Sequence, residues 1–378
     1  MNLLQLQEYF ETLIQCVATA YMTICLILCF VKSPKDAIYR PYRQSKRMLT
    51  VAFGSMSLNL VAWCVLTTGS WAKFNYAIAC IDIVLFYFEE LLLCYSFCHI
   101  LNNSFITKRR LLKDAAQMSV STVLAVMSLF PALAGSRMTL LMVSLAVMME
   151  NIVELAFLFH KQYKLNGELL DNYFSTDMHK FVRWTNTSII LLIISWVMAL
   201  VTMFTNVLVN WAFQLYMVPL NIFIAVSFIN FAAKYGDIAK AYQSADNTAD
   251  NAADEAAQPS ASADDDIKRN TLEQKIKTWV DTKKYIGTQF TIDELASTLG
   301  TNKNYLSYFI NERYGMNFSA WVSSLRIEEA KQMMRAKPEQ KLEEVAYFVG
   351  FSSPSYFSKV FSLHEGVSPT VWRRSITK

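Results

Sequence analysis

The chain has 378 residues, of which 53% are hydrophobic and only 17% are charged. This composition is too apolar for an ordinary soluble protein, and 10 Gly, 8 Pro and 7 Cys exclude collagen-like, disordered and disulfide-rich secreted chains. The net charge of +4 conceals three regions, because residues 1–240 carry +5, residues 241–267 carry −7 and residues 268–378 carry +6. We therefore expect three parts of different character.

Residues 1–240 contain seven apolar stretches that are long enough to cross a bilayer, since about 20 helical residues span a hydrocarbon core of about 30 Å. These stretches lie at 13–31, 48–68, 76–100, 115–133, 138–159, 187–205 and 211–231. The sequence thus predicts an all-α chain that begins with a seven-helix transmembrane bundle. An arrangement of six spans and a re-entrant segment is the alternative, but it would leave the C-terminal part outside the cell.

The loops between these stretches predict the orientation of the bundle. Fourteen Lys and Arg residues lie in the first, third and fifth loops, whereas the intervening loops hold only Lys73 and Arg137. Because basic loops stay in the cytoplasm, we expect a multi-pass protein of the cytoplasmic (inner) membrane with its N-terminus outside and its C-terminal part inside. Glu8 and Glu11 stand where a cleavable signal peptide would be basic, so we expect no such peptide.

Five acidic residues fall inside the expected spans, where charges are costly. They are Asp82, Glu89, Glu90, Glu150 and Glu154, and the spans contain no Lys or Arg to pair with them. Polar contact between helices is the preferred interpretation. The alternative hypothesis is an acidic signal pocket that accepts a small cation or a proton.

The sequence predicts neither a metal site nor a cofactor nor an enzyme. Cys94 and Cys98 share a helical face, but no further Cys or His pair completes a tetrahedral set of zinc ligands. The four His are dispersed, and the chain has no phosphate-binding Gly-rich loop and no Ser/His/Asp spacing.

Residues 241–267 are rich in Ala, Asp, Asn and Ser and have almost nothing to bury. This composition predicts a flexible acidic linker, in which the alanines favour transient helix. We interpret the linker as a spacer.

From residue 268 onward the spacing of apolar residues predicts two helix-turn-helix units. In the first, Thr291 and Glu294 form a capping box and Gly300 provides the turn. The second repeats the pattern, with Gly350 at the turn, Ser353 as a helix cap and Pro354 at the first helical position. A helix at about 318–335 joins them. The expected core positions are Leu295, Ala296, Leu299, Leu306, Phe309, Ile310, Val345, Ala346, Val349, Phe357 and Phe361.

Several motifs in residues 270–375 resemble those of AraC-type (AraC/XylS) transcriptional regulators. The second unit reads G-F-S-x-x-S-Y-F-S-K-x-F from Gly350 to Phe361 and is followed by G-V-S-P and Trp372-Arg373. The joining helix contains Leu325-Arg326-Ile327-Glu328-x-Ala330. The chain resembles the membrane-anchored members of this family, because nothing in it matches the β-rich effector domain of the soluble members.

The resemblance implies which residues contact DNA, and helical spacing places the same residues away from the apolar stripes. Asn pairs with adenine, Lys with guanine and Ser with several base edges, while basic residues also contact phosphates. The expected DNA-binding residues are Lys303, Asn304, Ser307, Tyr308, Asn311, Ser355, Ser358, Lys359, Arg373 and Arg374.

We therefore expect a membrane-embedded transcriptional regulator with a transmembrane sensor domain at 1–240, a linker at 241–267 and a DNA-binding domain at 268–378. Its expected partners are double-stranded promoter DNA, membrane lipid, a small cationic ligand or proton, and either the transcription machinery or a second copy. The alternative is a transporter or channel with a regulatory helix-turn-helix tail. That alternative ranks lower because the first region has no internal repeat or pair of broken helices.

Overall fold

The computed structural model describes residues 3–66, 75–202, 207–254, 263–287 and 289–376. Its contacts divide the chain into two compact units, one formed by Met1–Asn166 and Phe181–Ala239 and the other by Gly167–Lys180 and Lys240–Lys378. The all-α fold is confirmed: β structure in the described ranges amounts to an isolated bridge between Phe174 and Thr291.

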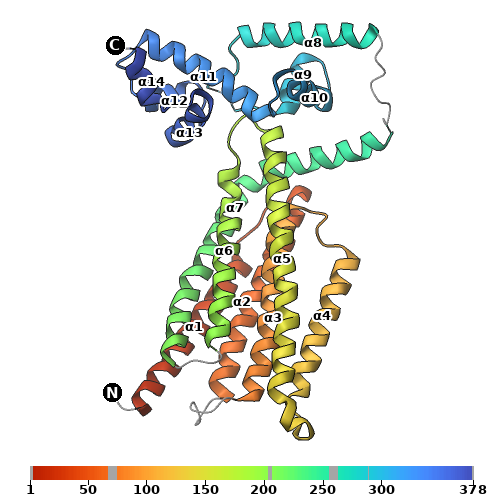
Figure 1. Ribbon diagram of the computed structural model, residues 1–378, viewed down its shortest axis with the longest axis vertical. Helices are drawn as coiled ribbons and strands as arrows, with labels where there is room; N and C mark the ends of the chain where they lie inside the picture. Colours follow the sequence, from red (N-terminus) through yellow and green to blue (C-terminus); the bar gives the residue numbers. More distant parts are fainter. Residues whose placement is uncertain (1–2, 67–74, 203–206, 255–262, 288, 377–378) are drawn as a thin grey trace. The chain divides into compact units, whose positions relative to one another are not determined.

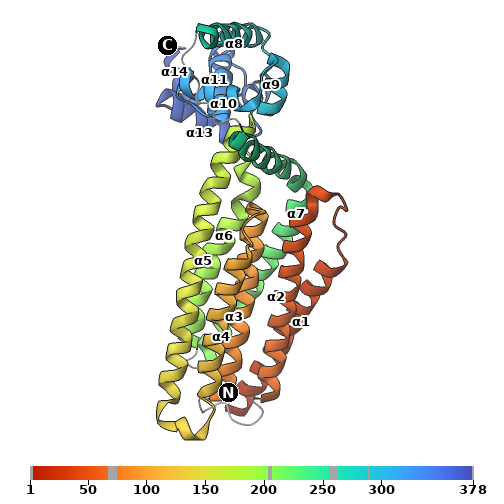
Figure 2. The same cartoon turned by 90° about the vertical axis from the view of Figure 1, so that its right-hand side faces the viewer.

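The first unit is a bundle of long helices that lie side by side in both views (Figures 1 and 2). Its helices are α1 (Leu3–Phe30), α2 (Arg40–Leu66), α3 (Tyr76–Leu101), α4 (Lys108–Met127), α5 (Arg137–Tyr173), α6 (His179–Thr202) and α7 (Val207–Asp254). Short 3-10 helices precede α2 (η1, Ala37–Tyr39) and α5 (η2, Pro131–Ser136). The last residues of α5 and α7 and the first two of α6 belong to the second unit, so three helices are each shared between the units.

Within the described residues, five helical segments are long and apolar enough to cross a membrane, and they correspond to α1, α2, α5, α6 and α7. The third expected span is helical as α3, but it carries Asp82, Glu89 and Glu90. The fourth is α4, which begins with the basic residues Lys108 and Arg109. The seven-span topology stays a prediction. Parts of it, namely the span ends at 68 and 205 and the loop with Lys73, lie outside the described residues.

Several helix boundaries differ from those of the expected spans; α5, for example, continues to Tyr173, beyond the expected end at 159. The expected fourth span reached residue 133, but α4 ends at Met127, ahead of Pro131, because proline cannot continue the hydrogen-bond pattern of a helix. The linker also differs: α7 continues to Asp254 and α8 begins at Ala263. Alanine has the highest helix propensity, which explains why this part of the acidic segment is helical. Residues 255–262 lie outside the described ranges.

Serine side chains join neighbouring helices inside the bundle. Ser57 on α2 donates to the carbonyl of Ala18 on α1 at 2.8 Å. The hydroxyls of Ser121 on α4 and Ser144 on α5 lie 2.9 Å apart, and each also contacts the other residue's carbonyl. Small hydroxyl residues allow the close helix approach on which packing in a membrane depends.

The second unit has two hydrophobic cores that share one helix, α11 (Phe318–Ala336). The first core lies beneath α8 (Ala263–Asp281), α9 (Ile292–Leu299) and α10 (Lys303–Tyr314). The second lies beneath α12 (Leu342–Phe348), α13 (Pro354–Glu365) and α14 (Pro369–Ile376). The residues expected in the core of both helix-turn-helix units are buried.

Candidate functional site

The first helix-turn-helix unit consists of α9 and α10. The predicted capping box is present, because the Thr291 hydroxyl accepts from the Glu294 N–H and the Glu294 carboxylate accepts from the Thr291 N–H. Gly300 ends α9 in the left-handed conformation (φ 65°), which lets the chain turn directly into α10. The turn therefore fixes the angle at which α10 leaves the core.

The outer face of α10 carries most of the DNA-binding residues predicted for this unit. Asn304, Tyr308 and Asn311 are exposed, and Ser307 is half-buried. Tyr308 exposes 54% of its surface although its ring is large and apolar. Amide, hydroxyl and aromatic groups on one exposed helical face can form hydrogen bonds and apolar contacts with base edges.

Lys303, at the start of α10, is held by the chain itself. Its ammonium group donates to the carbonyl and to the hydroxyl of Ser244, near the end of α7. The Ser244 hydroxyl in turn donates to the carboxylate of Asp293 at 2.9 Å. Burial lowers the pKa of Lys303, and Asp293 opposes this shift. In this arrangement Lys303 is not available to a phosphate or a base.

The second helix-turn-helix unit consists of α12 and α13, and its predicted DNA-binding residues include fewer long side chains than those of α10. The Ser353 hydroxyl accepts from the N–H of Tyr356 at 3.2 Å, and Pro354 occupies the first turn of α13, as predicted. Ser355 and Lys359 are exposed and Ser358 is half-buried. This helix therefore has one long charged side chain, Lys359, among the residues predicted to read bases.

The two arginines predicted near the C-terminus differ in their surroundings. Arg374 is exposed. Arg373 donates to the carbonyls of Pro338, at 3.1 Å, and of Gln340, in the loop before α12. These bonds give Arg373 a role in fixing this loop, a role that the sequence did not indicate.

Arg326 is the largest fully buried side chain in the described part of the second unit, with 1% of its surface exposed. Its Nε donates to the carbonyl of Tyr285 and its Nη1 to the carbonyl of Ser175, both at 2.9 Å. Ser175 lies between α5 and α6, and it exchanges hydrogen bonds of 3.0 Å with the backbone of Phe290. The segment Gly167–Lys180 is thus tied to the helix-turn-helix domain by its backbone.

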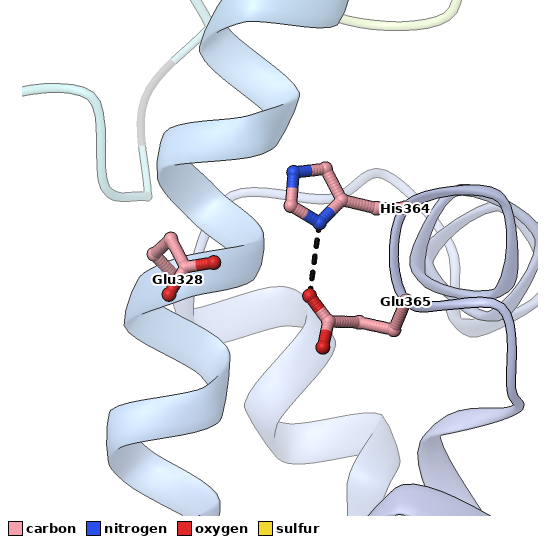
Figure 3. Close-up of side chains that lie close together, drawn as sticks. All are labelled: Glu328, His364 and Glu365. Carbon is pink, nitrogen blue, oxygen red and sulfur yellow. Dashed lines mark hydrogen bonds and ion pairs between the residues drawn. The ribbon is translucent and has the colours of Figure 1, made fainter.

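A small cluster on the second helix-turn-helix unit brings together Glu328 of α11 with His364 and Glu365 of α13 (Figure 3). Lys331 is bonded to Glu328 at 2.8 Å and to Glu365 at 3.0 Å, and His364 is bonded to Glu365 at 2.9 Å. Burial opposes ionisation of Glu365, but the bonds from His364 and Lys331 outweigh it and hold its pKa below the usual value. An ion-pair network therefore satisfies the groups that a metal would need.

The five acidic residues predicted as a signal pocket are not gathered into one site. Asp82 lines a cavity in the bundle, whereas Glu89 and Glu90 are buried and do not line it. Glu150 is exposed on the surface of α5. Glu154 forms an ion pair with Lys113 of α4.

This ion pair gives Glu154 a basic partner from just outside the expected spans, which themselves hold no Lys or Arg. Lys113 precedes the apolar part of α4, but the antiparallel packing of α4 and α5 brings it to Glu154. The neighbouring Asp114, which the sequence did not single out, is 4% exposed and accepts hydrogen bonds from Tyr95 and, at 3.0 Å, from Asn151. Because Asp114 lies beside a basic loop in sequence, its burial could not be predicted from its position.

Comparison with known proteins identifies the two helix-turn-helix units and the helix between them. A family model described as "Helix-turn-helix domain" matches residues 295–375. The uncharacterized transcriptional regulatory protein YesN of Bacillus subtilis is 34% identical over 74 residues, which are 19% of this chain and 20% of YesN. The regulatory protein PocR of Salmonella typhimurium is 29% identical over 87 residues, 23% of this chain and 28% of PocR.

A third relative, the HTH-type transcriptional activator RhaR of Cronobacter sakazakii, is 35% identical over 69 residues, 18% of this chain and 24% of RhaR. The chain thus spans less than a third of the length of each of these relatives, two of which are described as transcriptional regulators and one as a regulatory protein. No solved structure matches the chain. Residues 295–375 are therefore a helix-turn-helix domain of the AraC type.

Proposed function

We propose that this chain is a membrane-embedded, sequence-specific transcriptional regulator whose C-terminal domain binds promoter DNA. One observation carries the proposal: an AraC-type domain with two exposed helix faces lies in the same chain as five helices apolar enough to cross a membrane. Since the domain is tethered, promoter DNA has to come to the membrane.

In this proposal α10 and α13 read bases in the major groove. Asn304 and Asn311 supply amides, Ser307 and Tyr308 supply hydroxyls, and Lys359 is a guanine contact of α13. Ser355 and Ser358 add short polar contacts. Arg374 and, once released from Ser244, Lys303 are suited to phosphates, which position a protein without reading sequence.

The contacts of the second unit support a restrained DNA-binding domain. The segment Gly167–Lys180 holds Arg326 through Ser175, and Ser244 engages Lys303. Both restraints come from residues that continue directly into helices of the bundle, α5 and α7. We infer that a signal received by the bundle changes these contacts and thereby the presentation of α10.

Chromatin immunoprecipitation of the full-length protein tests the proposal. We expect sharp promoter peaks that weaken about tenfold or more in Asn304→Ala and Lys359→Ala, because a good base contact is worth about 1–3 kcal/mol. Gln332→Ala and Lys337→Ala are the matched controls, since they remove the same groups from exposed positions outside α10 and α13.

Equal loss in the controls would mean that general charge or stability, and not base reading, causes the effect. Peaks that persist in both test variants would contradict the assignment of α10 and α13. Absence of peaks in every version, with the protein intact in the membrane fraction, would oppose the proposed function and favour a transporter whose tail contacts protein.

A further inference from the structure

The bundle contains a cavity of about 160 Å³ that is lined by residues of six helices, namely α1, α2, α3, α5, α6 and α7. Its lining includes Asn59 and Trp63 of α2, Asp82 and Phe86 of α3, and Trp196 of α6. An apolar cavity of about 150 Å³ is large enough for benzene. The space is therefore suited to a small organic molecule.

Asp82 gives this cavity one acidic group. The Asn59 side chain is hydrogen-bonded to the Asp82 carboxyl group. The other end of that amide, Oδ1, is buried and makes no hydrogen bond to a described residue. No described residue of the lining is basic. A carboxylate and a spare amide oxygen side by side can accept two N–H groups from one ammonium ion.

The remaining walls are mostly aromatic and aliphatic. The rings of Trp63, Phe86, Trp196 and Phe213 line the cavity, seven other lining side chains are aliphatic or Met, and Thr202, Asn210 and Gln214 add uncharged polar groups. Aromatic faces attract organic cations, and this attraction grows as water is excluded. Apolar and aromatic walls with a small number of polar groups are typical of small-molecule sites.

We propose that this cavity binds a small organic ammonium ion, with Asp82 as its counter-ion and an apolar body no larger than about a benzene ring. That the ligand is the regulatory signal rests on the proposed function; the binding site itself does not. Glu89, Glu90, Glu150 and Glu154 do not line it.

The order of residues along the helices places the cavity at one end of the bundle. It is lined by the last turns of α2 and α6 and by the first turns of α3, α5 and α7. In the predicted topology this end faces outside. The ligand would then reach the cavity without crossing the membrane, and α5 and α7 would connect its walls to the residues that hold the DNA-binding domain.

The test uses the purified full-length protein in lipid nanodiscs and follows the shift of its unfolding midpoint with ligand concentration. Benzylammonium is the probe, and benzyl alcohol is its neutral isostere. We expect benzylammonium to bind at least about tenfold more tightly than benzyl alcohol, and Asp82→Asn to abolish this difference. Glu154→Gln, an acid of α5 that pairs with Lys113 and does not line the cavity, should preserve it.

A second pair of variants distinguishes loss of the binding site from misfolding. Phe86→Leu should weaken benzylammonium binding several-fold, whereas Phe88→Leu, two residues along α3 and outside the lining, should not. Equal binding of the two probes, unchanged preference in Asp82→Asn, or no binding of benzylammonium at millimolar concentration would each overturn the proposal. Because this measurement contains no DNA, its failure is distinguishable from a failure of promoter binding.

Discussion

At the scale of single residues, Arg326 is the most informative side chain of the second unit. Burial lowers its pKa to about 10, so the guanidinium stays charged at neutral pH inside a protein core. A buried cation is stable only if its N–H groups find acceptors. The carbonyls of Tyr285 and Ser175 are two of these acceptors, and they precede Arg326 in the chain by 41 and 151 positions.

Arg326→Lys is expected to open this connection without removing the charge, because one ammonium group cannot reproduce the fork of a guanidinium. Loss of a charge-assisted hydrogen bond costs about 1.5–3 kcal/mol, which corresponds to about tenfold or faster exchange of the amides that it protects. Hydrogen exchange of the full-length protein should show this acceleration at Ser175 and Phe290. Arg335→Lys, exposed on the same helix, is the control; unchanged exchange in Arg326→Lys would refute the role.

The sequence predicted part of this residue's role. Arg326 lies in a motif that resembles AraC-type regulators, so its membership of the helix-turn-helix domain was predictable. Its partner Ser175 is 151 positions away, in a loop that positive-inside reasoning treats only as a carrier of charge. The aromatic pair Tyr173-Phe174 beside it was the available sign that this loop has something to bury.

At the scale of elements, prediction succeeded where the chemistry is local. The capping box of α9, the Ser353 cap of α13 and the buried stripes depend on residues three or four positions apart, and the structure has them all. The length of α7 was not predicted. The alanines of the acidic segment favour a helix, whereas its low hydrophobicity favours a flexible chain.

The turn between α12 and α13 leaves little room for an added methyl group. Gly350 has φ 98°, and a Cβ there would lie 3.0 Å from the Arg326 guanidinium and from the backbone nitrogen of Gly287. We expect Gly350→Ala to destabilise the second helix-turn-helix unit by about 2 kcal/mol or more, since strain and overlap add.

Gly366→Ala separates these two causes. Gly366 also has a positive φ (74°), but nothing lies within 4 Å of the position that an added methyl group would occupy, so only the strain of about 1 kcal/mol remains. Hydrogen exchange of α12 and α13 in the full-length protein measures both costs. Equal costs for the two variants would mean that close packing against Arg326 does not contribute.

At the scale of the whole molecule, the division into two units follows tertiary contacts, which the sequence patterns predict only in part. Charge and hydropathy change near residue 240, and the boundary between Ala239 and Lys240 lies at this point. The same patterns assign Gly167–Lys180 to the membrane part, yet this segment belongs to the unit that contains the helix-turn-helix domain. The segment lies between two helices of the bundle in sequence, but the hydrogen bonds of Ser175 with Phe290 and Arg326 join it to the second unit.

Ser244, near the end of α7, contacts Lys303 of α10. A variant at this position can therefore test whether α7 restrains DNA binding by α10. Ser244→Arg would put a second cation against Lys303 and remove the hydroxyl that bridges it to Asp293. Like charges repel, so Lys303 should be released and become available to a phosphate. We expect promoter occupancy, measured by footprinting with the full-length protein in nanodiscs, to rise several-fold.

Gln243→Arg adds the same charge one residue earlier, at an exposed position, and separates release of Lys303 from a general gain in positive charge. A rise confined to Ser244→Arg means that the contact between Ser244 and Lys303 keeps α10 from binding DNA. A rise in both variants means that added charge alone strengthens binding. If occupancy falls in Ser244→Arg and not in its control, the contact with Ser244 supports the binding-competent form, and restraint has to be sought at Ser175 instead.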